Sequence, residues 1–141
     1  MSESSACAVA PQPQFFGALN KEPKLKFAIE IRSLGDALVM HCKGRITFRE
    51  EALAFSRKVE DLASRTRQLV LDMHCVDAID SAGLGELVAA LHSSREAGCE
   101  MRLAAPSPRV LGMLQLTNLL SVLEVHPSVE EAALAFHGQM A

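Results

Sequence analysis

The residues best suited to chemistry in this chain lie between positions 80 and 85, in the sequence DSAGLG. This segment follows an apolar run at residues 69–71, and it opens a stretch with apolar residues at Leu84, Leu87, Val88 and Leu91. That spacing is typical of one face of a helix, so Ser81 stands where a strand gives way to a helix, directly after Asp80. The N–H groups of a first helical turn have no partners within the helix and carry the positive end of its dipole. A phosphate on Ser81 would meet that positive end.

The same segment also fits a purely structural role. Asp and Ser are among the commonest residues that cap the start of a helix, and Gly83 and Gly85 would then serve only to pack the turn tightly. In this second interpretation Ser81 caps the helix and carries no modification.

Signals for enzymatic chemistry are weak in this chain. The sequence has neither a phosphate-binding P-loop nor the glycine pattern of a dinucleotide site, and Ser81 does not lie in the G-x-S-x-G pattern of a catalytic serine. A catalytic serine needs a histidine base and an orienting carboxylate. The histidines are scattered through the chain and none lies in a recognisable motif: His41, His74, His92, His126 and His137. We expect a protein that is not an enzyme.

The His41-Cys42 and His74-Cys75 pairs invite a metal-binding interpretation. Adjacent residues in a strand point to opposite faces, so each pair offers at most one ligand to a given side. None of the four cysteines forms a C-x-x-C pair. The sequence therefore predicts no metal site, and it predicts no cofactor.

Composition narrows the class of partner. The chain has 141 residues, of which 49% are hydrophobic and 22% charged, and its net charge is −3. This balance, without a dense Lys/Arg cluster, argues against nucleic-acid binding. No uncharged apolar run reaches the roughly 20 residues that a membrane span requires. The N-terminus lacks a basic leader with a sustained apolar core, so we expect a cytoplasmic protein.

The first part of the chain divides into a tail and the beginning of a folded domain. Residues 1–24 are rich in Ser, Ala, Pro and Gln and predict a flexible tail, whereas residues 25–141 form the domain. Strands are expected at residues 25–32 and 37–42, joined by a turn at Gly35-Asp36, with Gly44 ending the second strand. The next helix has an apolar face at Phe48, Ala52, Phe55, Val59 and Leu62, and Thr47 with Glu50 predicts a capping box at its start.

The second part alternates strands and helices. Residues 69–71 predict a central parallel strand, residues 82–97 a helix that stops at Gly98, and residues 101–104 a further strand. A helix begins at Ser107-Pro108, a short strand spans residues 122–125, and Ser128 caps the last helix. The order is β-β-α-β-α-β-α-β-α. It predicts an α/β fold in which a mostly parallel mixed sheet, with the opening hairpin at one edge, is covered by about four helices.

Residues 69–85, LVLDMHCVDAIDSAGLG, resemble the core of a STAS domain, the family of bacterial anti-sigma factor antagonists and of the cytoplasmic tails of sulphate transporters. The similarity runs from about Lys26 to about Phe136. Further landmarks follow in the order expected of the family: Gly44-Arg45-Ile46, Val70-Leu71-Asp72, Asp80 to Gly85, and Gly98 before Met101-Arg102-Leu103.

The resemblance implies a phosphorylation-switched binding module. Antagonists of this family bind an anti-sigma factor that is also a serine kinase with a histidine-kinase-like ATP site, and this binding frees a sigma factor. Phosphorylation of the serine after the motif aspartate, here Ser81, breaks the complex, and a serine phosphatase restores it. The partner-binding residues expected on this chain are Asp80, Ser81, Ala82, Gly83, Leu84, Thr47, Arg45 and Met113. Met113 also fits packing in the core, and self-association remains possible.

One departure from the family pattern keeps a second function open. Many antagonists carry an acidic residue about where Thr47 stands, whereas this chain lacks that charge and places Arg45 nearby. Stand-alone STAS proteins also act as constitutive adaptor subunits, on the ATPase of an ABC transporter or in signalling scaffolds. In that role Ser81 would only cap its helix.

Overall fold

The computed structural model describes residues 27–140, which form a five-stranded sheet and four α-helices. The elements are β1 (Phe27–Leu34), β2 (Ala37–Ile46), α3 (Phe48–Ala63), β3 (Gln68–Ile79), α4 (Ser81–Glu96), β4 (Glu100–Ala104), α5 (Pro108–Leu116), the 3-10 turn η1 (Leu119–Ser121), β5 (Val125–His126) and α6 (Val129–Met140). The strands lie in the order β1-β2-β3-β4-β5. Only β1 and β2 are antiparallel; the other neighbours are parallel. The mostly parallel sheet with an edge hairpin is confirmed, whereas the predicted tail at residues 1–24 lies outside the described residues.

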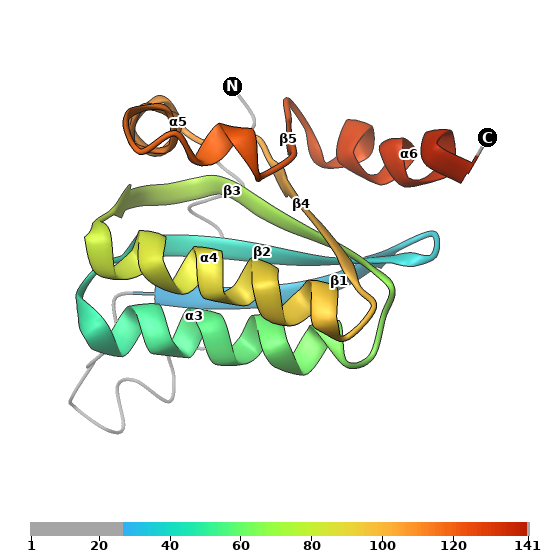
Figure 1. Cartoon of the computed structure of the whole chain (residues 1–141), viewed down its shortest axis with the longest axis horizontal. Helices are drawn as coiled ribbons and strands as arrows, with labels where there is room; N and C mark the ends of the chain where they lie inside the picture. The colour runs from blue at the N-terminus through green and yellow to red at the C-terminus, as the bar shows by residue number, and fades with distance from the viewer. Residues whose placement is uncertain (1–26, 141) are drawn as a thin grey trace.

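Helices cover both faces of the sheet (Figure 1). The larger core cluster joins one face of β2 and β3, including Met40, Leu69 and Leu71, to buried residues of α3 and α4. Side chains alternate along a strand, so Val39 and Val70 face the other way, where they pack with Phe136 of α6. This double coverage explains why the centre of β3 is a continuous apolar run.

Two strands are longer than the sequence pattern suggests. The strand expected to end at Gly44 continues to Ile46, and the strand expected at residues 69–71 extends to Ile79. The extra residues pair with each other, since Gly44 lies beside Val76 and Ile46 beside Ile79, with a register shift after Gly44. Gly44 adopts a φ of 108°, a conformation that glycine reaches without strain, so it forms an irregularity within the strand and does not end it.

Two expected apolar faces also need correction. Phe48, assigned above to the buried face of α3, is 70% exposed, while Phe55, Val59 and Leu62 are buried as expected. Val88 of α4 is likewise exposed, although Leu84, Leu87 and Leu91 lie in the core. Phe48 is the first residue of α3, and its side chain extends past the end of the packed helix face.

The ends of the later helices follow the sequence signals. Ser107 caps α5 by accepting from the N–H of Val110, and Ser128 accepts from the N–H of Glu131 at the start of α6. Gly98, with a φ of 81°, follows the end of α4. The last strand is shorter and later than expected, because Val122, which was expected to begin it, instead ends the turn η1 in a helical conformation. Within residues 27–140, no helix combines the length and apolar character needed to cross a bilayer.

Candidate partner-binding site

Asp80 joins the starts of two helices. It is the N-cap residue of α4, and its Oδ1 accepts a hydrogen bond from the backbone N–H of Gly83 at 2.9 Å. Its Oδ2 accepts from the backbone N–H of Phe48, the first residue of α3, at 3.0 Å. One carboxylate therefore satisfies an N–H group at each of two helix starts, although Asp80 and Phe48 lie 32 residues apart in the sequence.

The surroundings of Asp80 favour its charged form. Partial burial alone would raise the pKa of this carboxyl, but the backbone N–H groups of Phe48 and Gly83, with smaller contributions from Ala82 and Asp80 itself, hold the pKa below its ordinary value of 3.8. Asp80 is thus a carboxylate at neutral pH and places a negative charge directly before Ser81.

Ser81 is the first residue of α4, and it is exposed. Because Asp80 occupies the capping position and accepts from Gly83, the Ser81 hydroxyl is not the group that caps the helix. Among the hydrogen bonds of the described residues, none involves the Ser81 side chain. The hydroxyl therefore stands in solvent at the positive end of the helix dipole.

Gly83 fixes the position of this turn against the sheet. A Cβ at this position would collide with the carbonyl oxygen of Ile46 and would lie 2.7 Å from Cγ1 of Ile79. Leu84 follows it into the core. Both residues were expected to contact a partner, but both are buried, so their side of the turn faces the sheet and supports the exposed residues from beneath.

Gly85 lies on the outer side of the same turn. It is exposed, and a Cβ built there meets nothing within 4 Å. Its spacing of four residues from Ser81 places the two on one helix face. A glycine inside a helix costs about 1 kcal/mol relative to alanine, and no close packing around Gly85 offsets that cost. The surface beside Ser81 is consequently flat. Ala82, by contrast, is half-buried against the core.

The loop before α3 lies beside Asp80. Thr47 occupies the N-cap position, but its side chain makes no capping hydrogen bond, so the predicted capping box is wrong. Asp80 instead accepts the N–H of Phe48. Phe48 has a φ of 62°, which is rare for a bulky residue and unfavourable by about 1–2 kcal/mol. An exposed ring on a strained backbone, beside the motif turn, belongs to the candidate site, although sequence periodicity placed it in the core.

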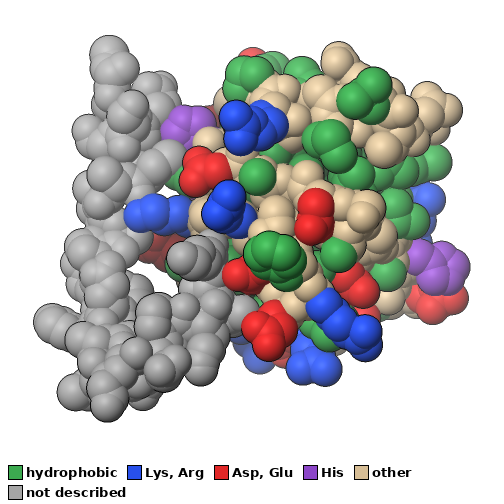
Figure 2. Space-filling view, turned by 90° about the vertical axis from the view of Figure 1, so that its left-hand side faces the viewer, with side chains coloured by type: hydrophobic (Ala, Val, Ile, Leu, Met, Phe, Trp, Pro, Cys, Tyr) green, Lys and Arg blue, Asp and Glu red, His purple; other side chains and the backbone are tan. Residues whose placement is uncertain are grey.

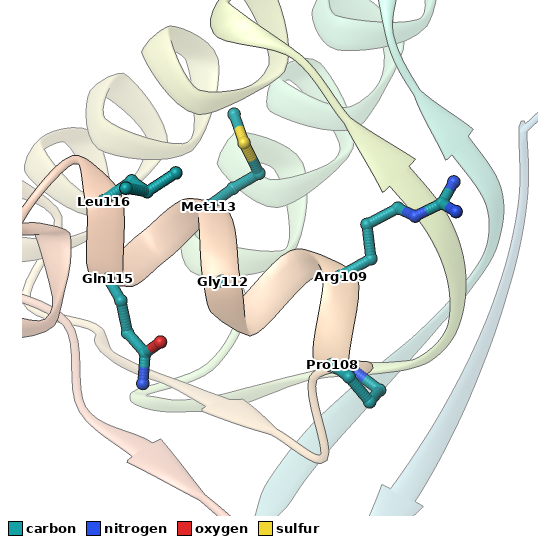
Figure 3. A pocket seen from close by; sticks show the side chains of 6 residues that line it. All are labelled: Pro108, Arg109, Gly112, Met113, Gln115 and Leu116. Carbon is teal, nitrogen blue, oxygen red and sulfur yellow. The ribbon is translucent and has the colours of Figure 1, made fainter.

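The remaining predicted contacts come from β2 and α5. Arg45 is exposed near the end of β2, where it lies opposite Ala78 of β3. Met113 is half-buried against the core, whereas Leu116, one turn later, is 82% exposed. Both line a shallow depression on α5 (Figure 3), whose residues are Pro108, Arg109, Gly112, Met113, Gln115 and Leu116. The side chains of Met113 and Leu116 extend from the same side of the helix, and Gln115 points away from them.

The elements that carry these residues meet at one end of the molecule. Figure 1 shows the starts of α3 and α4 together with α5 at this end of the sheet. Viewed from that end, the described surface mixes apolar side chains with charges of both signs (Figure 2). A mixed surface of this kind suits a protein partner better than a polyanion.

The pairs of histidine and cysteine do not assemble a metal centre within the described residues. His41 instead makes a hydrogen bond with Asp72, with 2.6 Å between Nδ1 and Oδ2. Burial, with a smaller effect of the Asp72 charge, raises the pKa of Cys42. Burial likewise raises the pKa of Cys99 to about 11, helped by Glu100. Both thiols are neutral at physiological pH, which makes them poor nucleophiles and poor metal ligands.

The family model for the STAS domain matches residues 28–132, and this chain belongs to the STAS domain family. The match covers both strands of the opening hairpin, the Asp80-Ser81 turn and the first residues of α6.

Solved structures of the same fold include anti-sigma factor antagonists from several bacteria. One from Mycobacterium paratuberculosis superposes with a TM-score of 0.69 at 20% identity, over 77% of this chain and 92% of that one. A putative anti-sigma factor antagonist from Thermotoga maritima gives 0.65 at 26% identity, over 76% and 92%.

SpoIIAA, a Bacillus cell fate determinant, has this fold in two covalent states. Its unphosphorylated form superposes with a TM-score of 0.64 at 17% identity, over 79% of this chain and 97% of that one. Its phosphorylated form gives 0.58 at 15% identity, over 77% and 99%.

Proposed function

We propose that this STAS domain protein is an anti-sigma factor antagonist whose binding to an anti-sigma factor is switched off by phosphorylation of Ser81. The observation that carries the proposal is that neighbouring residues at the start of α4 have different roles. Asp80 makes the capping hydrogen bond and Gly83 fits the sheet, so the exposed Ser81 hydroxyl is left without a structural task. The fold shared with anti-sigma factor antagonists supports the same class of partner.

A phosphate on Ser81 would act mainly on a bound partner. The helix dipole favours added negative charge at this position, while the neighbouring Asp80 carboxylate opposes it. These effects offset each other in the free domain, so the fold should tolerate the modification. In a closed interface the same phosphate would lose its water, which is costly unless the partner offers a cation.

The contact surface that we assign combines Ser81 and Gly85 of α4 with Phe48, the first residue of α3. Gly85 leaves room for a close approach to Ser81, and the exposed Phe48 ring offers an apolar contact of the kind that anchors interfaces. Arg45 and Leu116 lie on neighbouring elements and extend this surface. Gly83 and Leu84 act from beneath by holding the turn.

The partner is then a serine kinase with a histidine-kinase-like ATP site, acting in the cytoplasm, and a serine phosphatase resets the switch. Nucleotide belongs to the kinase, so the antagonist itself is a binding module without catalysis or cofactor. Sequestering the kinase frees a sigma factor, which makes the protein a regulator of transcription.

The test uses purified anti-sigma factor kinase from the same organism, with binding measured by calorimetry. Ser81→Asp should weaken binding at least about 30-fold, since a charge left unpaired in an interface costs about 2 kcal/mol or more. Ser64→Asp is the matched control, because it adds the same charge to an exposed serine at the other end of α3 and should bind like the wild type. With ATP, the kinase should phosphorylate the wild type and leave Ser81→Ala unmodified.

Two results would contradict the proposal. One is phosphate mapped to another residue while Ser81→Ala remains a full substrate. The other is equal affinity of the wild type and Ser81→Asp, which would favour a constitutive adaptor, such as a subunit of a transport ATPase.

A further inference from the structure

Strand β1 forms an open edge of the sheet. It pairs with β2 along its whole length, and within residues 27–140 no strand lies on its other side. The start of β1 packs on the core, where the centroid of the Phe27 ring lies 6.1 Å from that of Phe55 in α3. The larger helix contacts with the sheet are made by α3 on β2 and β3 and by α6 on β3, β4 and β5. An edge of this length presents a row of backbone N–H and C=O groups that can pair with another strand.

The side chains in the second half of β1 are exposed, whereas Phe27 and Ile29 are half-buried against the core. From Glu30 to Leu34 every residue is exposed, including the apolar Ile31 at 38% and Leu34 at 39%. Glu30 and Arg32 project from the face opposite α3 and form an ion pair with each other at 3.0 Å. The strand thus carries apolar residues on an uncovered surface together with one charge of each sign.

The charges distinguish between the ways in which two copies of β1 can pair. In a two-fold antiparallel pair the axis is perpendicular to the sheet, so directly opposite residues lie on the same face. Two registers give the longest overlap. Centring the pair on Glu30 places Glu30 opposite its own copy, which is repulsive. Centring it on Ile31 places Glu30 of each copy opposite Arg32 of the other.

We propose that the protein forms a two-fold homodimer by antiparallel pairing of β1 with the β1 strand of a second copy, centred on Ile31. The two Ile31 side chains then meet on the face of α3, and two Glu30–Arg32 pairs form on the other face. At each end, Leu34 lies opposite Ala28 of the other copy. The sheets of the two protomers become one continuous ten-stranded sheet.

The dimer leaves the Ser81 surface free. β1 lies at the edge of the sheet, and the exposed part of the strand runs toward the β1–β2 turn, away from the end where α3 and α4 begin (Figure 1). Two antagonist sites would therefore face solvent in one dimer. Because the contact is a single pair of strands, the affinity should be modest and should fall with added salt.

The experiment is a concentration series of the full-length chain in sedimentation equilibrium, with charge reversals on β1. Glu30→Arg places Arg opposite Arg, and Arg32→Glu places Glu opposite Glu, so each single variant should raise the dimer dissociation constant about tenfold or more. The double variant Glu30→Arg/Arg32→Glu restores unlike pairs in the same register and should return the constant to the wild-type value. Arg65→Glu, on an exposed ion pair outside β1, is the control and should dimerise like the wild type.

A second variant tests the centre of the pair. Ile31→Lys brings two ammonium groups together at the two-fold axis and should abolish the dimer, while its circular dichroism spectrum should match that of the wild type. Ser81→Asp should dimerise normally, which separates this proposal from the one about kinase binding.

The proposal is overturned if the wild type remains monomeric up to its solubility limit, which would leave the edge of β1 to another occupant. It is also overturned if dimers form but persist in both single variants, or if the double variant fails to recover the dimer lost in the single ones.

Discussion

The starts of α3 and α4 are neighbours in space, but they are stabilised in different ways. At α4, Asp80 caps its own helix and a glycine allows the first turn to rest on the sheet. At α3, Thr47 makes no side-chain cap, the first residue has a φ of 62°, and its N–H bonds to Asp80 of the other helix. One start is therefore locally complete, and the other depends on a tertiary contact.

This difference determines which parts of the molecule a modification at Ser81 would affect. A phosphate beside Asp80 acts on the carboxylate that also holds Phe48, so the two helix starts share one electrostatic centre. An exposed phenylalanine held in a strained conformation is costly, and such costs persist in proteins mainly at functional sites. The comparison thus favours the pair of helix starts, more than α5, as the centre of the contact surface.

The largest expected effect comes from Gly83. Gly83→Ala forces a Cβ against the backbone of Ile46, which cannot move without displacing β2, so unfolding should become easier by about 3 kcal/mol. Urea denaturation followed by circular dichroism measures this change. A stability equal to that of the wild type would show that α4 is not seated by this contact.

Removal of the Asp80 carboxylate, which both helix starts share, should cause the second-largest loss of stability. Asp80→Ala loses a hydrogen bond at each helix start and should lower the free energy of unfolding by about 2 kcal/mol, whereas Asp80→Asn, which keeps one acceptor, should lose about half of that. Thr47→Ala is the matched control at the other start and should change little, because its hydroxyl makes no cap. If Thr47→Ala proved as harmful as Asp80→Ala, the asymmetry between the two starts would be disproved.

Substitution of Phe48 should stabilise the fold, in contrast to the substitutions of Gly83 and Asp80. Phe48→Gly relieves the unfavourable φ and should raise the free energy of unfolding by about 1 kcal/mol, while removing the exposed ring from the contact surface. The measurement combines urea denaturation with kinase binding. A more stable protein that binds the kinase more weakly is the expected combination, and unchanged binding would remove Phe48 from the surface.

Acid should weaken the two helix starts together. The folded state holds the pKa of Asp80 below its ordinary value, so its stabilisation is complete above pH 3.8 and is lost as the pH falls through the folded pKa. The stability of the wild type should therefore approach that of Asp80→Asn in strong acid and separate from it as the pH rises. Parallel stability curves from pH 2 to pH 7 would contradict this assignment.

The smallest effect on folding belongs to Gly85. Gly85→Ala should raise the free energy of unfolding by up to about 1 kcal/mol, because the position is open and alanine favours the helix. Gly85→Trp should fold equally well but should block the close approach of the kinase beside Ser81. Normal kinase binding by the tryptophan variant would place the interface elsewhere.

Much of the fold could be predicted from local patterns. The hairpin, the alternation of strands and helices, and the caps Ser107 and Ser128 follow from periodicity and residue type, which act over a few residues. The lengths of β2 and β3 could not be predicted this way. Their last residues are polar or irregular in sequence, and they are extended only because each strand pairs with the other.

The candidate site divides along the same line. The start of α4 directly after Asp80 was predicted correctly, because capping chemistry is local, whereas the roles of Asp80 and Ser81 in partner binding stay predictions. The exposure of Phe48 was missed, since its spacing matches the buried face of α3. The one signal against burial was its position as the first residue of the helix.

The sequence by itself determined the family, the order of strands and helices along the chain, and the serine after the motif aspartate, because these depend on residue type and short spacing. Only the tertiary structure decided which residues of the motif face outward. Gly83 and Gly85 are the same residue two positions apart, yet one lies against the backbone of β2 and the other in open solvent. The Asp80 carboxylate also accepts a hydrogen bond from the N–H of Phe48, which lies 32 residues away in the chain, and only the folded geometry brings these two groups together.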